Sequence, residues 1–164
     1  MPQPGFRPGC VCCKGRQQEK EEKMVKETYS AEETRQLGKE LGEKAFPGQV
    51  ICLLGDLGTG KTVFTKGFAQ GLGITEPVSS PTFTILQTYE EGRLPFYHFD
   101  VYRIGSPDEM DEIGFDDCIF GDGVSMIEWA DLIEEILPPS YTKICIEKDP
   151  EKGFDYRKIT IERI

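Results

Sequence analysis

A short apolar run that leads directly into a glycine-rich segment constrains this chain more than any other feature. Residues 50–54 read VICLL, and residues 55–62 follow at once as GDLGTGKT. The run has the length and the β-branching of a strand buried on both faces of a parallel sheet. From Phe64 to Leu72 apolar residues recur at helical spacing, and Gly73 is a typical helix stop. We therefore predict a strand, a tight loop and a helix in direct succession.

The glycine-rich segment fits the pattern G-x-x-x-x-G-K-[ST] in full. When such a loop joins a buried strand to a helix, its backbone N–H groups and the helix N-terminus converge on a β-phosphate. Lys61 would bridge the β- and γ-phosphates, and the Thr62 hydroxyl would ligate Mg²⁺. The alternative is a glycine-rich turn that binds no ligand. The predicted nucleotide-binding residues here are Gly55, Asp56, Leu57, Gly58, Thr59, Gly60, Lys61, Thr62 and Val63.

A loop of this kind also needs a carboxylate for the metal, normally where a neighbouring strand ends. Residues 124–127 form a second apolar run that ends at Glu128, and Asp100 ends the extended segment HFD. Both residues qualify. The alternatives are a strand-end cap for Glu128 and, for Asp100, a surface carboxylate or one paired with Arg103. His98 is the only histidine of the chain, and we interpret it as packed or hydrogen-bonded rather than catalytic.

The rest of the pattern indicates an α/β domain. Ser30 and Glu33 form a capping box, so a helix should follow until Pro47-Gly48 ends it. Further predicted elements are an antiparallel strand pair within 82–102, a helix from residue 106, a helix over 131–137, and strands at 144–146 and 159–161. We predict a P-loop NTPase-like three-layer fold, with a compact mixed β-sheet flanked by helices. Residues 24–164 would form this single domain, and residues 1–23, rich in Pro, Gly and charge, a disordered tail.

The charge balance and the hydropathy exclude two classes of protein. A net charge of −10 argues against a stand-alone nucleic-acid binder, because the basic field that attracts phosphate backbones is missing. No apolar run approaches the ~18 residues of a membrane span, and no signal-peptide core is present. We expect a soluble, cytoplasmic protein. Residues 108–135 are rich in carboxylates and contain no Lys or Arg, which predicts a solvated face or a docking surface for a basic partner.

The six cysteines do not form a disulfide or metal pattern. Cys52, Cys118 and Cys145 lie in or beside apolar runs, where a thiol usually acts as a small buried hydrophobe. Cys10, Cys12 and Cys13 lie in the tail, which offers no fourth zinc ligand.

Four separated motifs together resemble one known family. They are GDLGTGKT at 55–62, SPTF at 80–83, HFDVYR at 98–103 and IEWA at 127–130. Their order and spacing resemble the TsaE (YjeE) family, bacterial ATPases needed to make threonylcarbamoyladenosine in tRNA. The resemblance runs from about Thr28 to the C-terminus. It implies a P-loop fold with a compact mixed sheet, with ATP and Mg²⁺ as cofactors. It also implies TsaD and TsaB as partners, tRNA being reached only through that complex.

The resemblance also assigns roles to individual residues. It implies that Lys61, Asp100 and Glu128 are catalytic, and that Thr62, Asp100 and Glu128 serve the metal. It further implies that Thr82 is placed to sense the γ-phosphate and that Trp129 matters for activity. The family commonly has a second hydroxyl after GKT, where this chain has Val63, so a contact to the α-phosphate is lost.

Three other functions are weighed against the accessory ATPase. A small-molecule P-loop kinase usually closes several arginines over the phosphates, and between Lys66 and Lys143 this chain has only Arg93 and Arg103. A guanine-nucleotide switch normally reads its base with an N/T-K-x-D motif. This chain has Thr142-Lys143 but lacks the Asp. A non-hydrolysing nucleotide-binding adaptor stays open. Because no arginine is obviously placed to stabilise the transition state, we predict slow ATP hydrolysis by the isolated chain.

Overall fold

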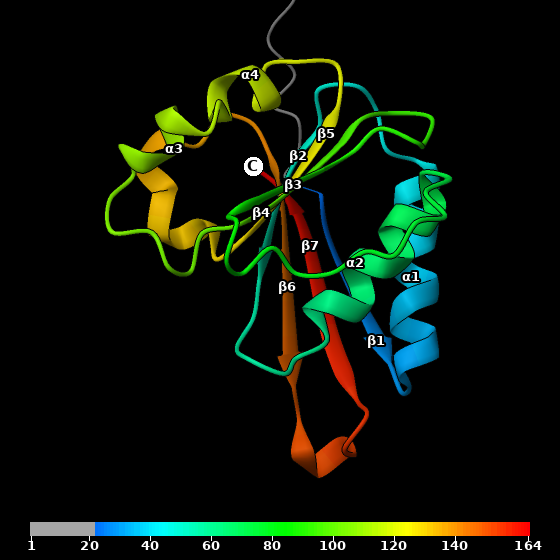
Figure 1. The fold of residues 1–164 in the computed structure, drawn as a ribbon. Coiled ribbons are helices and arrows are strands. Elements are labelled where there is room, and N and C mark those ends of the chain that lie inside the picture. Colours follow the sequence, from blue (N-terminus) through cyan, green and yellow to red (C-terminus); the bar gives the residue numbers. More distant parts are fainter. Residues whose placement is uncertain (1–21) are drawn as a thin grey trace, which may run out of the picture.

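A computed structural model describes residues 22–164, which form a seven-stranded mixed sheet between two layers of helices (Figure 1). The strand order is β1-β7-β6-β2-β5-β4-β3. β2 pairs in parallel with β5 and β6, β4 pairs in parallel with β5, and the outer pairings β1–β7, β7–β6 and β4–β3 are antiparallel. The strands are β1 Lys23–Thr28, β2 Val50–Leu54, β3 Leu86–Tyr89, β4 Phe96–Asp100, β5 Val124–Glu128, β6 Thr142–Lys148 and β7 Arg157–Arg163.

The helices lie on both faces of this sheet, so the predicted three-layer α/β fold is confirmed. In Figure 1, α1 and α2 cover one face, and α3, α4 and η1 cover the other. A separate apolar core fills each side of the sheet. The helices are α1 Ala31–Glu43, α2 Lys61–Gly71, α3 Glu109–Glu112, α4 Phe115–Ile119, and the 3-10 helices η1 Ala130–Ile136 and η2 Pro150–Lys152.

The central strand β2 has the surroundings that its composition predicts. It is buried along almost its whole length, with a parallel neighbour on each side. Because β2, β4 and β5 run in the same direction, their carboxyl ends meet at one edge of the sheet. Asp100 at the end of β4 lies opposite Glu128 at the end of β5 in the register. The topology therefore brings the loop after β2 and both predicted carboxylates to the same place.

Helix α1 begins at the predicted cap, with one difference in the hydrogen bonds. The Ser30 hydroxyl accepts a hydrogen bond from the Glu33 amide at 3.1 Å, as predicted. The Glu33 carboxylate, however, accepts from the Tyr29 amide at 2.9 Å instead of the Ser30 amide. The helix ends at Glu43, and Lys44 caps it before Pro47.

Helices α1 and α2 pack backbone against backbone through glycines. The glycines Gly38 and Gly42 of α1 and Gly67 and Gly71 of α2 lie so close to the opposite helix that an added Cβ would stand 2.0–2.3 Å from a carbonyl oxygen. The sequence also predicts a modest apolar stripe of Ala31, Leu37, Leu41 and Ala45. Of these, Leu37 and Ala45 are buried, Leu41 is half-buried and Ala31 is exposed. Small residues thus permit the close approach of the helix that follows the phosphate loop to its neighbour.

The predictions for the N-terminal boundary of the domain and for the helix from residue 106 need correction. Lys23 was assigned to the tail but begins β1, an edge strand in which only Thr28 is buried, so the strand shows no apolar alternation. The prediction of a disordered tail otherwise falls on residues outside those described, apart from Glu22. The prediction that Cys10, Cys12 and Cys13 do not form a zinc site falls there too. The helix predicted from residue 106 is confined to α3, and α4 was not predicted.

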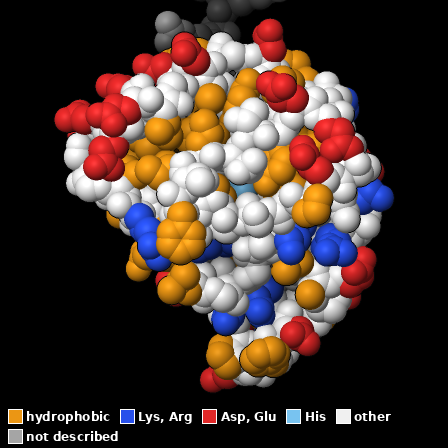
Figure 2. All heavy atoms as spheres, in the orientation of Figure 1, with side chains coloured by type: hydrophobic (Ala, Val, Ile, Leu, Met, Phe, Trp, Pro, Cys, Tyr) orange, Lys and Arg blue, Asp and Glu red, His pale blue; other side chains and the backbone are white. Residues whose placement is uncertain are grey.

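The surface over α3 and α4 is strongly acidic, as Figure 2 shows. Among its exposed side chains are Asp108, Glu109, Asp111, Glu112, Asp116 and Asp117. Of the three described cysteines, Cys52 is buried as predicted, and Cys118 and Cys145 are half-buried. Across residues 22–164, the structure contains no helix with the length and apolarity that crossing a membrane demands.

Candidate functional site

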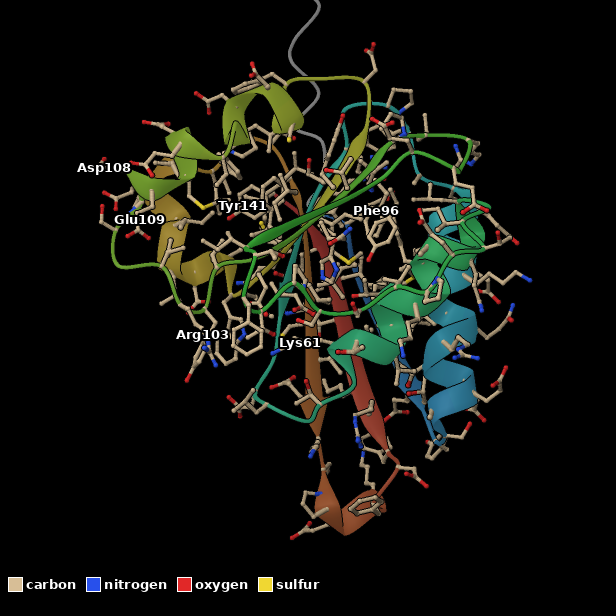
Figure 3. The ribbon with its side chains drawn as sticks, in the orientation of Figure 1. Lys61, Phe96, Arg103, Asp108, Glu109 and Tyr141 are labelled. Carbon is tan, nitrogen blue, oxygen red and sulfur yellow. The ribbon has the colours of Figure 1, made fainter. Side chains whose placement is uncertain are left out.

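A pocket of about 580 Å³ opens at the edge where the parallel strands end. It is lined by most of the predicted nucleotide-binding and catalytic residues, and Figure 3 labels Lys61 and Arg103 among them. A neighbouring pocket of about 490 Å³ is lined by Gly55, Asp56 and Thr59, and Trp129 borders both. The lining residues of the first pocket are Leu57, Gly58, Gly60, Lys61, Thr62, Val63, Ser80, Thr82, Asp100, Tyr102, Arg103, Glu128, Trp129 and Arg157.

The loop after β2 has the backbone geometry of an anion cradle. Gly58 and Gly60 have φ angles of 74° and 98°, which a residue with a side chain rarely adopts. Gly60 caps α2 without a side-chain hydrogen bond, so within residues 22–164 no side chain takes up the first N–H groups of the helix. Thr59 closes the loop by donating from its hydroxyl to the Asp56 carbonyl oxygen at 2.9 Å. Such an N-terminus is suited to bind a phosphate group.

Lys61 begins α2, and its side chain is only 8% exposed. Its ammonium group donates to the carbonyl oxygens of Gly55 and Asp56, and it lies 4.1 Å from the centre of the Trp129 ring, within the range of a cation–π contact. Burial lowers the pKa of Lys61, whereas the nearby carboxylates of Glu128 and Asp100 raise it less. The loop therefore holds a partly desolvated cation beside the cradle.

The two predicted carboxylates lie side by side and are bridged by a serine. Asp100 is 5% exposed and Glu128 is 3% exposed. The hydroxyl oxygen of Ser80 lies 3.0 Å from Asp100 Oδ2 and 3.2 Å from Glu128 Oε2. The Thr82 hydroxyl lies 3.4 Å from the Ser80 hydroxyl. The segment that carries Thr82 is therefore joined to both carboxylates through Ser80.

Glu128 is buried but keeps the properties of an ionised group. Burial alone would raise the pKa of Glu128, but His98, Lys61 and Ser80 together hold that pKa below its usual value. The closest approach of His98 is 3.7 Å, from Nε2 to Glu128 Oε1. The His98 ring also stacks on Phe96, which agrees with the prediction of a packed histidine.

The arrangement fits a magnesium ion bound together with phosphates. The described residues contain no group of three or more His, Cys, Asp or Glu side chains that could hold a metal by themselves. Mg²⁺, however, is usually held by one or two carboxylates together with substrate phosphates and water. Asp100, Glu128 and the Thr62 hydroxyl all line the pocket, and they are the hard oxygen donors that Mg²⁺ prefers.

Two arginines, Arg103 and Arg157, line the pocket. Arg157, at the start of β7, donates from Nε to the Thr59 carbonyl oxygen at 2.7 Å, and from Nη1 to two carbonyls of its own turn. Arg103 lies over the exposed Phe83 ring at 4.6 Å. It forms no ion pair with Asp100 in the described structure, so the alternative of an Asp100–Arg103 ion pair is wrong. Sequence spacing does not reveal Arg157, because the last strand reaches the loop only through the tertiary fold.

Trp129 stands directly after Glu128 in a conformation that is unusual for a bulky residue. Its φ angle is 61°, in the left-handed region. Its ring contacts Tyr102 at a centroid distance of 4.8 Å on one side and the Lys61 ammonium on another. Backbone strain of this kind, about 1–3 kcal/mol, is typical of functional sites.

Comparisons with known proteins agree with this geometry. The sequence profile of the family described as threonylcarbamoyl adenosine biosynthesis protein TsaE matches residues 28–159. The tRNA threonylcarbamoyladenosine biosynthesis protein TsaE of Bacillus subtilis is 50% identical over 137 residues, which are 84% of this chain and 84% of that protein. TsaE of Treponema pallidum is 46% identical over 109 residues, covering 66% of this chain and 80% of that protein.

A solved structure shows the same fold. The crystal structure of Bacillus subtilis YdiB matches with a TM-score of 0.75 and 44% sequence identity, over 87% of this chain and 86% of that chain. The family resemblance predicted from the four motifs is thereby confirmed. The chain belongs to the TsaE family, which acts in the biosynthesis of threonylcarbamoyladenosine in tRNA.

Proposed function

We propose that this protein is an accessory ATPase that binds and hydrolyses Mg-ATP to support the TsaD–TsaB complex in threonylcarbamoyladenosine modification of tRNA. The observation that carries the proposal is the convergence of the phosphate cradle, Lys61 and the Asp100–Glu128 pair on one pocket. In a member of the TsaE family, this combination favours nucleotide hydrolysis over a purely structural role.

Each part of the pocket has a distinct task in this proposal. The N–H groups at the start of α2 bind phosphate oxygens, and Lys61 places its charge between the β- and γ-phosphates. Asp100 and Glu128, kept close by Ser80, hold the metal and its water together with Thr62. When bound, Mg-ATP would supply the anhydride bond that water breaks, and the metal would neutralise charge on the phosphates.

The state of the two arginines supports slow hydrolysis by the isolated chain. Arg157 already donates to three carbonyl oxygens, and Arg103 lies against Phe83. An arginine that reaches the transferring phosphoryl group is worth ~10³–10⁵ in rate in other P-loop enzymes. We propose that TsaD–TsaB completes the catalytically competent site in the cytoplasm. This chain would then contact tRNA only through that complex. The acidic surface over α3 and α4 is one candidate docking face for a basic partner.

Phosphate release in single-turnover assays, with and without TsaD–TsaB, tests this proposal. We expect slow hydrolysis by the chain alone and faster hydrolysis in the complex. Lys61→Ala should abolish tight Mg-ATP binding by calorimetry, whereas Lys66→Ala, an exposed lysine of the same helix, should not. Glu128→Ala should reduce turnover more than it reduces binding.

Two outcomes would contradict the proposal. Binding of Mg-ATP without any phosphate release in the full complex would identify a non-hydrolysing adaptor. Reconstituted tRNA modification that proceeds equally well when this chain is omitted would remove it from the reaction.

A further inference from the structure

His98 is a buried polar side chain whose cost of burial the proposed roles do not explain. It lies on β4 and is 1% exposed. In the described part of the chain, neither of its ring nitrogens has a partner within hydrogen-bond distance. Leaving a buried polar group unpaired destabilises the folded state. Such a group in a native structure calls for a reason other than packing.

The strand geometry aims His98 at the carboxylate pair. Side chains two residues apart on a strand point to the same face, so His98 shares its face with Asp100. The parallel register places Asp100 opposite Glu128 on β5. As a result, His98 Nε2 approaches Oε1 of Glu128 at 3.7 Å, while Oε2 of the same carboxylate contacts Ser80. The two oxygens of Glu128 therefore have different neighbours.

The position of the imidazole ring is itself fixed by packing. The ring stacks nearly parallel on Phe96, with an angle of 11° between the planes and 6.0 Å between the centroids. The next residue with its side chain on that face, Asp100, is held by Ser80 and by the Tyr102 amide. Because packing fixes the ring, Nε2 keeps a constant position relative to Glu128.

We propose that His98 is a positioning residue for Glu128: its Nε2, 3.7 Å from Oε1 and so beyond hydrogen-bond distance, acts on that oxygen electrostatically and keeps Oε2 aimed at Ser80, Asp100 and the pocket. This inference rests on the proposed function, because the pocket is where Mg²⁺ would bind. Carboxylates that ligate metals are themselves held by neighbouring groups, and the loss of such a neighbour typically costs 10–100-fold in metal affinity or activity. His98 then acts through Glu128 and touches neither nucleotide nor metal.

Three substitutions at position 98 separate the polar ring nitrogen from the volume of the ring. His98→Phe keeps a ring on Phe96 but removes the nitrogen, and His98→Leu removes both the nitrogen and the ring. His98→Gln returns an N–H donor close to the place of Nε2. Ser125→Ala serves as the matched control, because Ser125 is also buried, has no partner among the described residues and lies on the neighbouring strand β5.

Two affinities are measured on the full chain. The first is the affinity for Mn²⁺, in place of Mg²⁺, by electron paramagnetic resonance with a saturating non-hydrolysable ATP analogue. The second is the affinity for the analogue in EDTA, by calorimetry. We expect Mn²⁺ to bind 10–100-fold more weakly to the Phe and Leu variants and close to normally to His98→Gln and Ser125→Ala. The metal-free affinity for the analogue should be unchanged in all four.

The outcomes distinguish this inference from the proposed function. Wild-type affinity for Mn²⁺ in the Phe or Leu variant overturns the role of His98. An equal loss of both affinities in all three variants, or failure of the Phe and Leu variants to fold, assigns His98 to structure alone and also overturns it. If the wild-type protein binds neither the analogue nor Mn²⁺ with it, the proposed function fails first, and the inference fails with it.

Discussion

Replacing Gly67 with alanine should destabilise the protein, although alanine is the better helix former. Gly67 lies in the middle of α2, where an added Cβ would stand 2.0 Å from the Arg35 carbonyl oxygen and 2.8 Å from the Arg35 carbonyl carbon. Ordinary contacts of a Cβ atom begin near 3.4 Å. The obstacle is helix backbone, which cannot turn aside as a flexible side chain can. Helices α1 and α2 would therefore have to separate.

The expected magnitude is the difference between two opposing contributions. Overpacking costs about 1–3 kcal/mol, and a collision with backbone belongs at the upper end. Alanine regains about 1 kcal/mol through its helix propensity. We therefore expect Gly67→Ala to lower the free energy of unfolding by about 2 kcal/mol, and at roughly 2–4 °C per kcal/mol to lower the Tm by about 4–8 °C.

Urea unfolding followed by circular dichroism measures this effect, and the same helix supplies the control. Gln70 is exposed on α2, so Gln70→Ala should be more stable than Gln70→Gly by about 1 kcal/mol. The change from glycine to alanine should thus have opposite signs at positions 67 and 70. A stabilising effect of Gly67→Ala would refute the backbone contact between α1 and α2.

Three further predictions concern single side chains. Arg157→Lys removes the Nε–H donor to the Thr59 carbonyl of the phosphate loop and should weaken Mg-ATP binding about tenfold by calorimetry. Arg163→Lys, at the other end of β7, should leave the affinity unchanged. Equal affinities of the two variants would exclude a role of Arg157 in holding the loop. Burial raises the pKa of the Cys52 thiol to about 12, so the thiol stays protonated below that pH. At about pH 9, Cys52 should therefore resist alkylation in the native protein and react in the unfolded chain. Labelling of native Cys52, detected by peptide mass, would contradict this. Ser125→Ala deletes a buried hydroxyl that has no partner in the described part of the chain, and it should raise the free energy of unfolding, measured in urea, by about 1 kcal/mol. A decrease would mean that the hydroxyl has a partner.

Local sequence signals predicted the parts of the fold that depend on neighbouring residues. The strand β2, its loop and α2 follow one another within about twenty residues, so apolar pattern and glycine spacing were sufficient. The antiparallel pair β3–β4 was equally local. Strand β1 was missed, because an exposed edge strand needs no apolar alternation and takes its stability from pairing with β7, more than a hundred residues away.

The site divides in the same way. Asp100 and Glu128 were predicted because each ends a strand-like segment, where a phosphate loop normally finds the carboxylate for its metal. The bridging role of Ser80 was not predicted, since it depends on the path of a segment without regular structure between α2 and β3. The placement of Arg157 needed the strand order, which no single motif contains.

The contact between Lys61 and Trp129 gives this protein its own optical probe. Trp129 is the only tryptophan in the sequence, so it dominates the intrinsic fluorescence of the chain. Its indole ring lies against the ammonium group of the lysine in the phosphate loop. The emission of an indole responds to nearby charge, and any event that moves Lys61 by an ångström or so changes the field at the ring. Events in the pocket can therefore be timed by stopped-flow fluorescence, in unlabelled protein and within larger assemblies, wherever the other chains lack tryptophan or remain constant in signal.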